Sequence, residues 1–479
     1  MKKLRNLLEG IEIISSKGDL DIDILGVSTN SKVTERGHLF FAVKGNNLDG
    51  HEFIDGAIRN GSNCIICSVI PKKIDTNLCY VQVKNMRVAI NKISSKFYNN
   101  PVKKLKIIAV TGTNGKTSIV YFLYQFLSFL DIKVGMLSTI ENKINDKSIS
   151  SSLTTPDPIE INKLMSEMVK MGKEYCVMEA SSHAIDQIRI SGSDINVAIF
   201  SNISHDHLDY HKTFLNYINA KKKLFDDLSE DSFSVINNDD KRADYIVQNS
   251  KSKVINYSVK SISENKARII EKSVEGMLVD IDNQRVSLGV IGEFNLYNIL
   301  SVYAFSKILK INKIESLKIL SKIKPPKGRL EFIKSSHGSI GIVDYAHTPD
   351  ALRNVLITLD DIKGDNKLIS IIGAGGDRDR KKRPEMGRVA EEYSDYVIIT
   401  SDNPRNEDQN DIIADITKGF KYDNYEIEID RKKAIINACN NLDNKSILLV
   451  AGKGHEDYQI IGENYIPHND MEILKNEFK

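Results

Sequence analysis

Short apolar runs recur along the chain, separated by stretches with a helical pattern. The clearest runs in its central and last parts span residues 175–178, 197–200, 368–372, 397–400 and 447–450. Strands buried on both faces have this composition, and intervening helices are typical of parallel sheets. Ligands bind such sheets beyond the carboxyl ends of the strands. The polar motifs that directly follow these runs are therefore the candidates for chemistry.

Two interruptions divide the chain. The Asn-Asn-Pro sequence at residues 99–101 and the Pro-Pro-Lys-Gly sequence at residues 325–328 favour turns or extended backbone. A length of 479 residues also exceeds what a single core usually serves. We expect an α/β protein with a small N-terminal α/β domain (1–100), a central domain with a mostly parallel sheet (101–326) and a C-terminal Rossmann-like domain (327–479).

Charge and composition exclude several classes of protein. The 66 Lys and Arg residues nearly balance the 64 Asp and Glu residues, so the net charge of +2 gives no global attraction to nucleic acid or membranes. No signal-peptide core or membrane-spanning stretch is recognisable, and we expect a cytoplasmic protein without membrane insertion. The five cysteines do not form a disulfide framework. Cys64 and Cys67 are spaced like metal ligands, but their apolar context predicts a buried strand.

The sequence VTGTNGKTS at residues 110–118 is the most informative motif. It lies between an apolar run and a helical pattern, which predicts a strand, a tight loop and a helix. Such a loop presents backbone N–H groups and a helix N-terminus to the phosphates of a nucleotide. Lys116 would reach the outer phosphates, and the Thr117 hydroxyl would bind Mg²⁺. The other residues expected to bind ATP here are Gly112, Thr113, Asn114, Gly115 and Ser118.

This match to a phosphate loop is imperfect. Val110 stands where the usual pattern has glycine, and a plain glycine-rich turn before a helix is the alternative interpretation.

Acidic and histidine residues follow the next two predicted strands. Glu179 directly follows residues 175–178, and residues 205–211 contain three His and two Asp. Hard carboxylate ligands beside a phosphate loop favour Mg²⁺ over zinc. Taken one at a time, these are ordinary loop or structural residues, but their place at strand ends makes them a candidate metal centre.

The form TGTNGKT, a glutamate after the following strand and a DHLDYH motif after the next resemble the Mur ligase family of ATP-dependent amide-bond-forming enzymes. The resemblance covers nearly the whole chain, with its motifs in order. It implies that Glu179 and His207 bind Mg²⁺ together with Thr117. It also implies that Lys221, in a segment like the family's Y-x-x-A-K, becomes an N6-carboxylysine (a carbamate) that helps to hold a second Mg²⁺. Without these neighbours, a solvated helix face would explain the lysine triplet.

Further segments resemble those around the nucleotide in this family. GEFNLYN at residues 292–298 is similar to the family's G-x-x-N-x-x-N, which implies that Asn295 and Asn298 contact adenine; a helix cap is the alternative. Other matches around the nucleotide, all in the last domain, are Arg329, Asp344 and His347. The active site would then be completed when the last domain closes on the ATP domain and excludes water.

Segments in the first two domains resemble the MurE subgroup of the family, which implies that they bind a uridine-nucleotide muramoyl peptide. The residues implied to contact it are Ser31, Asn46, Asn47, Thr154, Thr155, Ser181, Gln187 and Arg189. The chain has Asn30-Ser31-Lys32 where the family more often has Asp-Ser-Arg. Without the family, these residues are ordinary polar turns.

Three loops of the last domain resemble the same subgroup. They are the glycine-rich basic loop at residues 373–384, the DNPR turn at 402–405 and GKGHEDYQ at 452–459. DNPR is the version in enzymes that add meso-diaminopimelate, which has a second carboxylate that lysine lacks. A planar guanidinium can bind that carboxylate through two charge-assisted hydrogen bonds. The residues implied to bind the amino acid are Arg378, Asp402, Asn403, Arg405, Gly452 and Glu456.

Together these resemblances imply an ATP-dependent ligase that adds meso-diaminopimelate to UDP-N-acetylmuramoyl-L-alanyl-D-glutamate through an acyl phosphate, in peptidoglycan precursor synthesis. We expect a monomer that requires ATP and Mg²⁺, acts on small molecules and has no nucleic-acid partner. The residues expected to carry out catalysis are Lys116, Glu179, His207, Lys221, Asp344 and His347. The base that deprotonates the amine stays open among His207, His347 and solvent.

Three alternatives remain. One is a lysine-adding relative, which Arg405 disfavours. Another is a different muramoyl ligase or a folylpolyglutamate-type ligase. The third is a nucleotide-regulated protein that contacts nucleic acid through residues 378–383, which the balanced charge disfavours.

Overall fold

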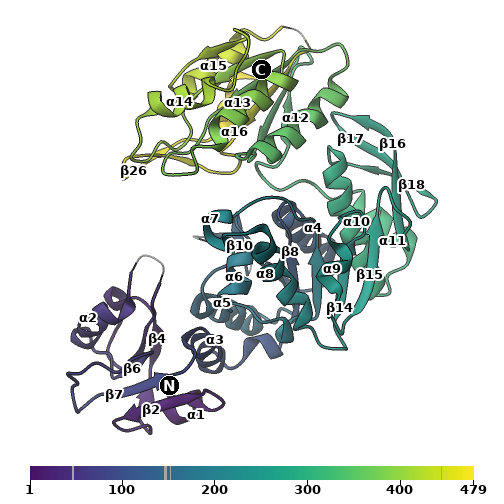
Figure 1. Cartoon of the computed structure of the whole chain (residues 1–479). Helices are drawn as coiled ribbons and strands as arrows, with labels where there is room; N and C mark the ends of the chain where they lie inside the picture. Colours follow the sequence, from purple (N-terminus) through teal and green to yellow (C-terminus); the bar gives the residue numbers. More distant parts are fainter. Residues whose placement is uncertain (46–47, 145–147, 151–152, 444, 479) are drawn as a thin grey trace. The chain divides into compact units, whose positions relative to one another are not determined.

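The computed structural model describes residues 1–45, 48–144, 148–150, 153–443 and 445–478 (Figure 1). They form two compact units. The first comprises Met1–Lys116, Leu127–Ile236 and Asp240–Ile255, and the second comprises Thr117–Phe126, Asn237–Asp239 and Asn256–Lys479. Both units contain sheets and helices, so the expected α/β class is confirmed. The domain boundaries near residues 100 and 326 stay predictions.

A five-stranded sheet forms the N-terminal part of the first unit. Its order is β2-β7-β6-β5-β4, with β4 to β7 parallel and β2 antiparallel to β7. Cys64 and Cys67 lie in buried strand β6, as expected, and burial raises the pKa of the Cys67 thiol to about 11. A raised pKa disfavours the thiolate that a metal needs. The elements here are β1 (Lys2–Lys3), α1 (Leu4–Leu8), β2 (Ile13–Lys17), β3 (Asp23–Ile24), β4 (Gly26–Ser28), β5 (His38–Ala42), α2 (Ile54–Arg59), β6 (Cys64–Cys67), β7 (Cys79–Val83) and α3 (Met86–Phe97).

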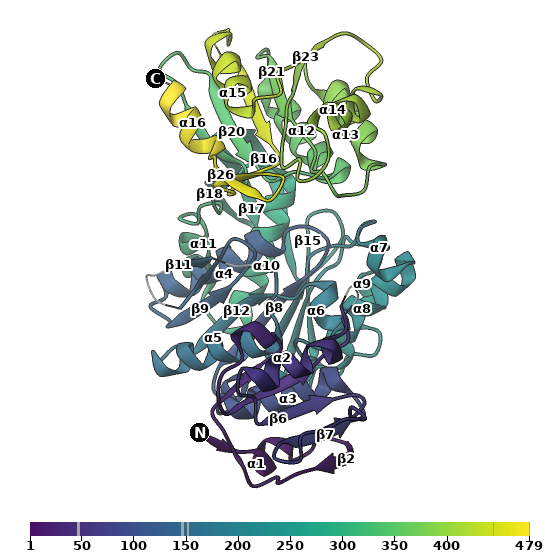
Figure 2. The same cartoon turned by 90° about the vertical axis from the view of Figure 1, so that its left-hand side faces the viewer.

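The larger sheet of the first unit has the order β11-β10-β9-β12-β8-β13-β14. Strands β9, β12, β8, β13 and β14 are parallel, as predicted, and Figure 2 shows β9, β12 and β8 side by side. Along this stretch of the chain the elements are β8 (Lys106–Thr111), α4 (Lys116–Phe129, most of which belongs to the second unit), β9 (Val134–Leu137), β10 (Glu141–Lys143), β11 (Ser148–Ser150), α5 (Pro158–Lys170), β12 (Tyr175–Glu179), α6 (Ser182–Asp186), β13 (Val197–Phe200), α7 (Leu208–His211), α8 (Phe214–Asp226), β14 (Phe233–Asn237) and α9 (Ala243–Val247).

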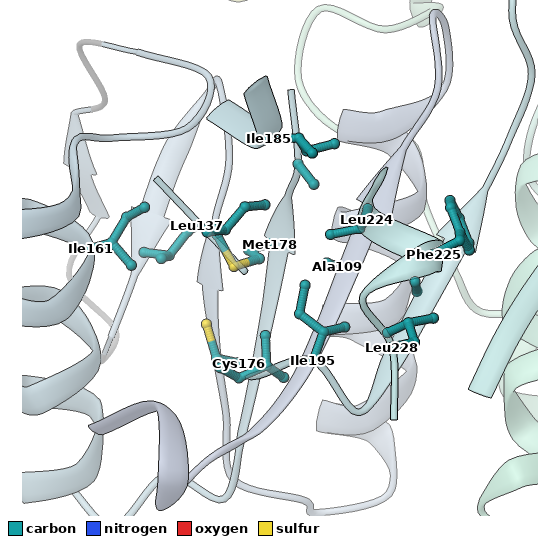
Figure 3. Packing of buried hydrophobic residues seen from close by; sticks show 14 of the residues in the cluster. Ala109, Leu137, Ile161, Cys176, Met178, Ile185, Ile195, Leu224, Phe225 and Leu228 are labelled. Carbon is teal, nitrogen blue, oxygen red and sulfur yellow. The ribbon is translucent and has the colours of Figure 1, made fainter. Parts of the chain in front are cut away.

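The core of this sheet is built from apolar side chains of the strands and of α5 and α8 (Figure 3). Met178 of β12, Ile161 of α5 and Phe225 of α8 belong to one buried cluster. The Thr213 hydroxyl oxygen accepts a hydrogen bond from Asn216 N, 3.2 Å away, and so caps the start of α8. Capping and the buried face together fix α8, which carries Lys221.

The second unit contains an antiparallel β16-β17-β18 meander that extends from β15, with helices α10 and α11 after it. The bounds are β15 (Lys253–Ser258), β16 (Asn265–Ser273), β17 (Gly276–Ile281), β18 (Gln284–Leu288), α10 (Glu293–Ile308) and α11 (Lys313–Leu320). The sequence pattern does not distinguish this meander from the surrounding α/β structure.

The last sheet has the order β19-β20-β24-β21-β22-β23, and all its strands except the edge strand β19 are parallel. Because β21, β22 and β24 are adjacent and parallel, the loops after them lie at one edge. The elements are β19 (Glu331–Lys334), β20 (Ile340–Asp344), α12 (Pro349–Lys363), β21 (Leu368–Ile372), α13 (Lys382–Tyr393), β22 (Tyr396–Ile399), α14 (Gln409–Thr417), β23 (Tyr425–Ile427), α15 (Arg431–Asn440), β24 (Ile447–Ala451), β25 (Tyr458–Ile461), β26 (Asn464–Pro467) and α16 (Asp470–Glu477).

A fully buried ion pair joins α15 and α16 beside this sheet. Arg431 Nε and Nη2 donate to the two carboxylate oxygens of Asp470 at 2.9 and 2.7 Å, and both side chains are 0% exposed. Arg431 Nη2 also donates to the carbonyl oxygen of Ala451 at the end of β24. Burial alone would raise the pKa of Asp470, but Arg431 and His468 hold it well below its usual value. This carboxylate therefore stabilises the fold at neutral pH, and its contribution disappears only as the pH falls through its lowered pKa.

We expect Asp470→Asn to lower the free energy of unfolding by about 3–5 kcal/mol, because it leaves the buried Arg431 charge without its counter-ion. Urea unfolding at pH 7 measures the change. Asp443→Asn is the matched control, since Asp443 pairs with Lys367 on the surface, where both side chains are about two-thirds exposed. The control should cost less than about 1 kcal/mol, and equal effects of the two substitutions would contradict this explanation.

Within the described part of the chain, no helix is both long and apolar enough to cross a membrane.

Candidate active site

The predicted strand, loop and helix are present at residues 106–129. The loop turns through Gly112 (φ +152°) and Gly115 (φ +88°) into α4, which begins at Lys116. A Cβ atom at Gly112 would lie 1.9 Å from Ser201 Oγ, so only glycine fits between the loop and the end of β13. Asn202 then holds the loop, because its carbonyl oxygen and its Oδ1 accept hydrogen bonds from the backbone N–H groups of residues 113 and 114.

Two lysines converge on one carbonyl group of this loop. Lys116 Nζ donates to Gly112 O at 3.0 Å and to Thr113 O at 2.8 Å, and Lys221 Nζ donates to Gly112 O at 2.7 Å. Lys221 is 1% exposed, and its Nζ lies 4.6 Å from the centre of the Tyr217 ring. Burial and the positive charge of Lys116 lower the pKa of Lys221 well below its ordinary value. The two residues selected from separate motifs therefore share one site.

Glu179 lies at the end of β12, opposite Val110 of β8. It is 1% exposed, and its Oε1 accepts a hydrogen bond from Thr139 N at 2.7 Å. Among the described residues, Glu179 Oε2 is buried and has no hydrogen-bond partner. A buried carboxylate oxygen without a donor fits a cation ligand, because leaving it unpaired is costly.

The histidines that follow β13 have different surroundings. His207, in the left-handed conformation (φ +53°), precedes α7, and its ring centre lies 4.9 Å from that of His183. His211 Nε2 lies 3.0 Å from Ser182 Oγ, whereas His205 stacks on Phe214. Within the described residues, no group of three or more His, Cys, Asp or Glu side chains can hold a metal by itself. Mg²⁺ commonly has only one or two carboxylate ligands besides substrate phosphates and water, so the buried Glu179 carboxylate fits that ion. The part of His207 in binding Mg²⁺ stays a prediction.

Four residues predicted to contact the muramoyl peptide form one hydrogen-bonded network. Thr155 Oγ1 donates to Glu179 O at 2.8 Å and contacts Ser181 Oγ at 3.3 Å. Arg189 Nη1 donates to Thr155 O at 2.7 Å, and its Nε and Nη2 both donate to Gln187 Oε1. This network therefore connects the backbone of Glu179 to the predicted peptide contacts.

A cavity of about 960 Å³ lies beside this network, lined in part by His183, Gln187, Tyr210 and His211. Thr154 is half-buried next to Thr155. Ser31 begins a short 3-10 helix in the N-terminal part, and Asn46 and Asn47 lie outside the described residues.

The residues predicted around the nucleotide in the second unit are mostly buried. Asn295 and Asn298 lie on one face of α10, and Asn298 Nδ2 donates to Asn295 Oδ1 at 3.0 Å. Asp344 accepts hydrogen bonds from Leu330 N and Ala346 N, each at 2.8 Å, and burial raises its pKa. The Arg329 guanidinium lies over the Tyr345 ring, 4.7 Å from its centre. His347 is exposed, and its Nδ1 is 2.8 Å from Tyr345 O.

The three loops predicted to bind the amino acid pack together at the edge of the last sheet. A Cβ at Gly376 would lie 1.8 Å from Pro404 O, and one at Gly452 would lie 2.5 Å from Asp402 Oδ2. Glycine at both positions therefore allows the loops after β21, β22 and β24 to approach closely.

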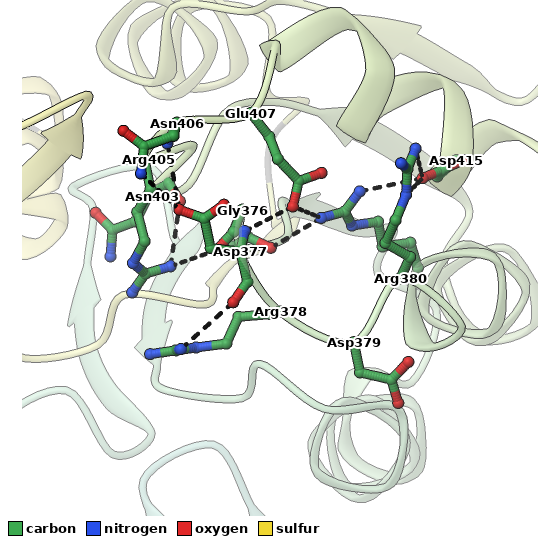
Figure 4. A network of polar contacts seen from close by, with 12 residues as sticks. Gly376, Asp377, Arg378, Asp379, Arg380, Asn403, Arg405, Asn406, Glu407 and Asp415 are labelled. Carbon is green, nitrogen blue, oxygen red and sulfur yellow. Dashed lines mark hydrogen bonds and ion pairs between the residues drawn. The ribbon is translucent and has the colours of Figure 1, made fainter. Parts of the chain in front are cut away.

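Arg405 and Arg378 both border Gly375. A Cβ at Gly375 would be 3.0 Å from Arg405 Nη1 and 3.7 Å from Arg378 Cγ. Arg405 Nη1 donates to Gly376 O at 2.9 Å, and Figure 4 shows Arg405 beside Asn403 and Asn406. The backbone of Arg405 (φ +53°) also pairs with β25, because Arg405 N donates to Ile460 O at 3.1 Å. The DNPR turn is thus held in place from both sides.

Two arginines of the basic run at residues 378–383, Arg380 and Arg383, have acidic partners. Arg383 is 1% exposed and pairs with Glu407 at 2.9 Å and with Asp415 at 3.1 Å. Arg380 pairs with the same Asp415 carboxylate at 2.9 Å (Figure 4). This pairing weighs against the alternative in which the run contacts nucleic acid.

Comparison with known proteins decides the family. The models described as Mur ligase family, catalytic domain, Mur ligase middle domain and Mur ligase, glutamate ligase domain match residues 23–111, 110–306 and 328–454, respectively. The chain belongs to the Mur ligase family.

Relatives within the Mur ligase family match over almost the full length. Proteins of Cytophaga hutchinsonii and Bacteroides fragilis, each named UDP-N-acetylmuramoyl-L-alanyl-D-glutamate--2,6-diaminopimelate ligase, are both 44% identical to this chain. The alignments cover 99% of this chain and 98% and 99% of the relatives. A solved structure with the same name is 29% identical, with a TM-score of 0.70, and the match covers 100% of this chain and 98% of that one.

Some residues of this Mur ligase site were not found from the sequence. Asn202 and Ser201 hold the phosphate loop, and Ser201 Oγ donates to Asn114 O at 2.6 Å. The sequence feature that points to Ser201 and Asn202 is their position directly after the predicted strand at residues 197–200. Lys453, inside the GKGHE motif, is 0% exposed and contacts two predicted ligands of the amino acid.

Proposed function

We propose that this Mur ligase joins meso-diaminopimelate to UDP-N-acetylmuramoyl-L-alanyl-D-glutamate at the expense of ATP, and that it acts as a cytoplasmic monomer. The main support for the proposal is that the side chains of Arg405 and Arg378 both lie next to Gly375, in the loops predicted to bind the amino acid. Asp402 and Glu456, which belong to the two neighbouring loops, supply negative charge. The far end of diaminopimelate bears a carboxylate and an ammonium group, so it needs partners of both signs. The 44%-identical relatives carry the name of this activity.

The reaction has two chemical steps. The side-chain carboxylate of D-glutamate first attacks the γ-phosphorus of ATP, ADP leaves, and an acyl phosphate forms. An amine of diaminopimelate then attacks the acyl carbon, loses a proton, and expels phosphate to give the amide. In this chain, Lys116 neutralises charge that develops on the transferred phosphoryl group, and the loop N–H groups hold the phosphates.

Glu179, His207 and the Thr117 hydroxyl would hold Mg²⁺ in this site. Bound Mg²⁺ would neutralise phosphate charge and polarise the transferred group. The buried, unpartnered Glu179 Oε2 supports this assignment. The proton of the amine would pass to His347 or to solvent, and to His207 only if that imidazole is not a ligand of Mg²⁺.

Lys221 is proposed to react with CO₂ to form a carbamate. Such a reaction needs a neutral amine, and the lowered pKa of Lys221 favours that form. We expect Lys221→Ala to lower kcat by about 10- to 100-fold, because the variant lacks the carbamate that would help to hold a second Mg²⁺. Lys223→Ala is the matched control for the modification, since Lys223 is exposed on the same helix. Because Lys223 also lines the cavity beside the predicted peptide contacts, Lys241→Ala, at an exposed position before α9, is the control for kcat.

Carbon-13 NMR of protein equilibrated with labelled bicarbonate tests the modification itself. A bound carbonyl resonance should appear in the native protein and in Lys223→Ala, and should be missing from Lys221→Ala. A resonance that survives in Lys221→Ala would place the carbamate elsewhere.

Identification of the product tests the proposed function. Purified protein is incubated with ATP, MgCl₂, UDP-N-acetylmuramoyl-L-alanyl-D-glutamate and meso-diaminopimelate, and the uridine-containing products are analysed by mass spectrometry. The expected product is heavier by one diaminopimelate residue and is absent when any component is omitted. ATP hydrolysis without this product would contradict the proposal.

A further inference from the structure

Lys453 lies between β24 and β25 and is 0% exposed. Its Nζ donates to Asn403 Oδ1 at 3.0 Å and to Glu456 Oε2 at 2.9 Å. Asn403 Nδ2 in turn donates to the same Glu456 oxygen at 2.9 Å. The three side chains therefore form a closed triangle of hydrogen bonds, although they belong to two different loops.

The backbone around Lys453 explains why its side chain is buried. Gly452 (φ +115°) and Gly454 (φ +54°) are both left-handed, so the chain turns sharply on each side of the lysine. A Cβ at Gly454 would lie 2.7 Å from Tyr345 Cβ, and one at Gly452 would lie 2.5 Å from Asp402 Oδ2. Glycines on both sides thus let Lys453 occupy the space between the loops.

The amide group of Asn403 is already engaged by protein. Its Oδ1 accepts from Lys453 Nζ and from Ile460 N, the latter at 2.9 Å, and the side chain is 4% exposed. These contacts fix Asn403 relative to both β25 and the GKGHE loop. They also orient the Glu456 carboxylate, which is only 17% exposed.

We propose that Lys453 is a positioning residue for the amino-acid substrate, a role that rests on the proposed function. Its ammonium holds Glu456 and the Asn403 turn in the arrangement that receives the far end of diaminopimelate. It also offsets one of the two negative charges that Asp402 and Glu456 bring to this end of the site. One net negative charge from Asp402 and Glu456 then remains, and it matches the single ammonium group at the far end of diaminopimelate. Arg405 binds the carboxylate at the same end of the substrate.

Lys453→Met tests this role, because methionine has a similar length but no charge or donor. The KM for meso-diaminopimelate should rise about 10- to 100-fold, since two hydrogen bonds to charged or buried partners are lost. The KM values for ATP and for the uridine-nucleotide substrate should change less than about twofold, because their predicted sites do not include this triangle. Lys432→Met, at an exposed position on α15, is the control and should leave all three KM values unchanged.

Lys453→Arg provides a second variant if the methionine protein does not fold. Arginine keeps the charge but places its donors differently, so it should restore part of the affinity for diaminopimelate and leave the other two KM values normal. A merely structural role would lower thermal stability in both variants without a selective change in the KM for diaminopimelate, and that result would overturn the proposal. If the native protein itself forms no product with diaminopimelate, the proposed function fails and this role fails with it.

Discussion

Lys116→Ala is expected to lower kcat for ligation by about 100- to 1,000-fold, because it removes a positive donor from the site of phosphoryl transfer. Lys116 is the first residue of α4 and directly follows Gly115. At this position, its ammonium group and the helix N-terminus would both contact the phosphates of bound ATP. Its Nζ already lies on the loop, 2.8 Å from Thr113 O. Steady-state assay of ADP formation with all three substrates measures the effect.

A folding defect must be separated from this catalytic effect. The two hydrogen bonds of Lys116 described above go to loop carbonyl groups, and we expect the midpoint of thermal unfolding to stay close to that of the native protein. Lys104→Ala, at an exposed position before β8, is the control and should keep full activity. Near-native turnover by a well-folded Lys116→Ala protein would end the phosphate-loop interpretation.

Arg405→Ala is expected to lower kcat/KM for meso-diaminopimelate by about 100- to 1,000-fold and to remove most of the preference over L-lysine. Only diaminopimelate has the far carboxylate that a guanidinium can bind at two points. In this structure Arg405 Nη1 donates to Gly376 O, so the side chain is already directed toward the glycine-rich loop. Parallel kcat/KM measurements for the two amino acids give the change in preference.

Arg405→Lys separates charge from geometry at this position. Lysine keeps the positive charge but cannot make two parallel hydrogen bonds to one carboxylate, so it should recover only part of the lost kcat/KM. An unchanged preference for diaminopimelate in Arg405→Ala would assign selectivity to another residue, with Arg378 the next candidate because it also borders Gly375.

The sequence was a good guide wherever chemistry follows a buried strand. Apolar runs predicted the strands, and parallel pairing then places Glu179 opposite Val110 and Phe200 opposite Thr111, so that the motifs after β8, β12 and β13 lie together. The same reasoning placed the loops after β21, β22 and β24 at one edge. These outcomes depend on local hydrophobic pattern and on a general property of parallel sheets.

Side-chain contacts between residues far apart in the sequence could not be predicted from the local hydrophobic pattern. Lys221 and Gly112 are 109 positions apart, and nothing in either motif shows that the lysine donates to the glycine carbonyl. Nothing in the basic run at residues 378–383 shows that Arg383 is buried against Glu407 and Asp415. Such pairings depend on how separate elements pack, which local patterns do not encode.

Asn403 shows the same limit at the predicted amino-acid site. The family resemblance implies that Asn403 binds the substrate, whereas its amide is engaged by Lys453, Glu456 and Ile460. Binding of the amino acid by Asn403 stays a prediction. The structure adds Lys453, whose Nζ donates a hydrogen bond to Asn403 Oδ1.

The most direct test of the central claim is phosphate release by the native protein with ATP, Mg²⁺ and UDP-N-acetylmuramoyl-L-alanyl-D-glutamate, compared between meso-diaminopimelate and L-lysine. The arrangement of Arg405, Arg378 and the acidic residues predicts that kcat/KM for diaminopimelate exceeds that for lysine by at least about 100-fold. Equal rates, or faster release with lysine, would contradict the assignment of diaminopimelate as the substrate.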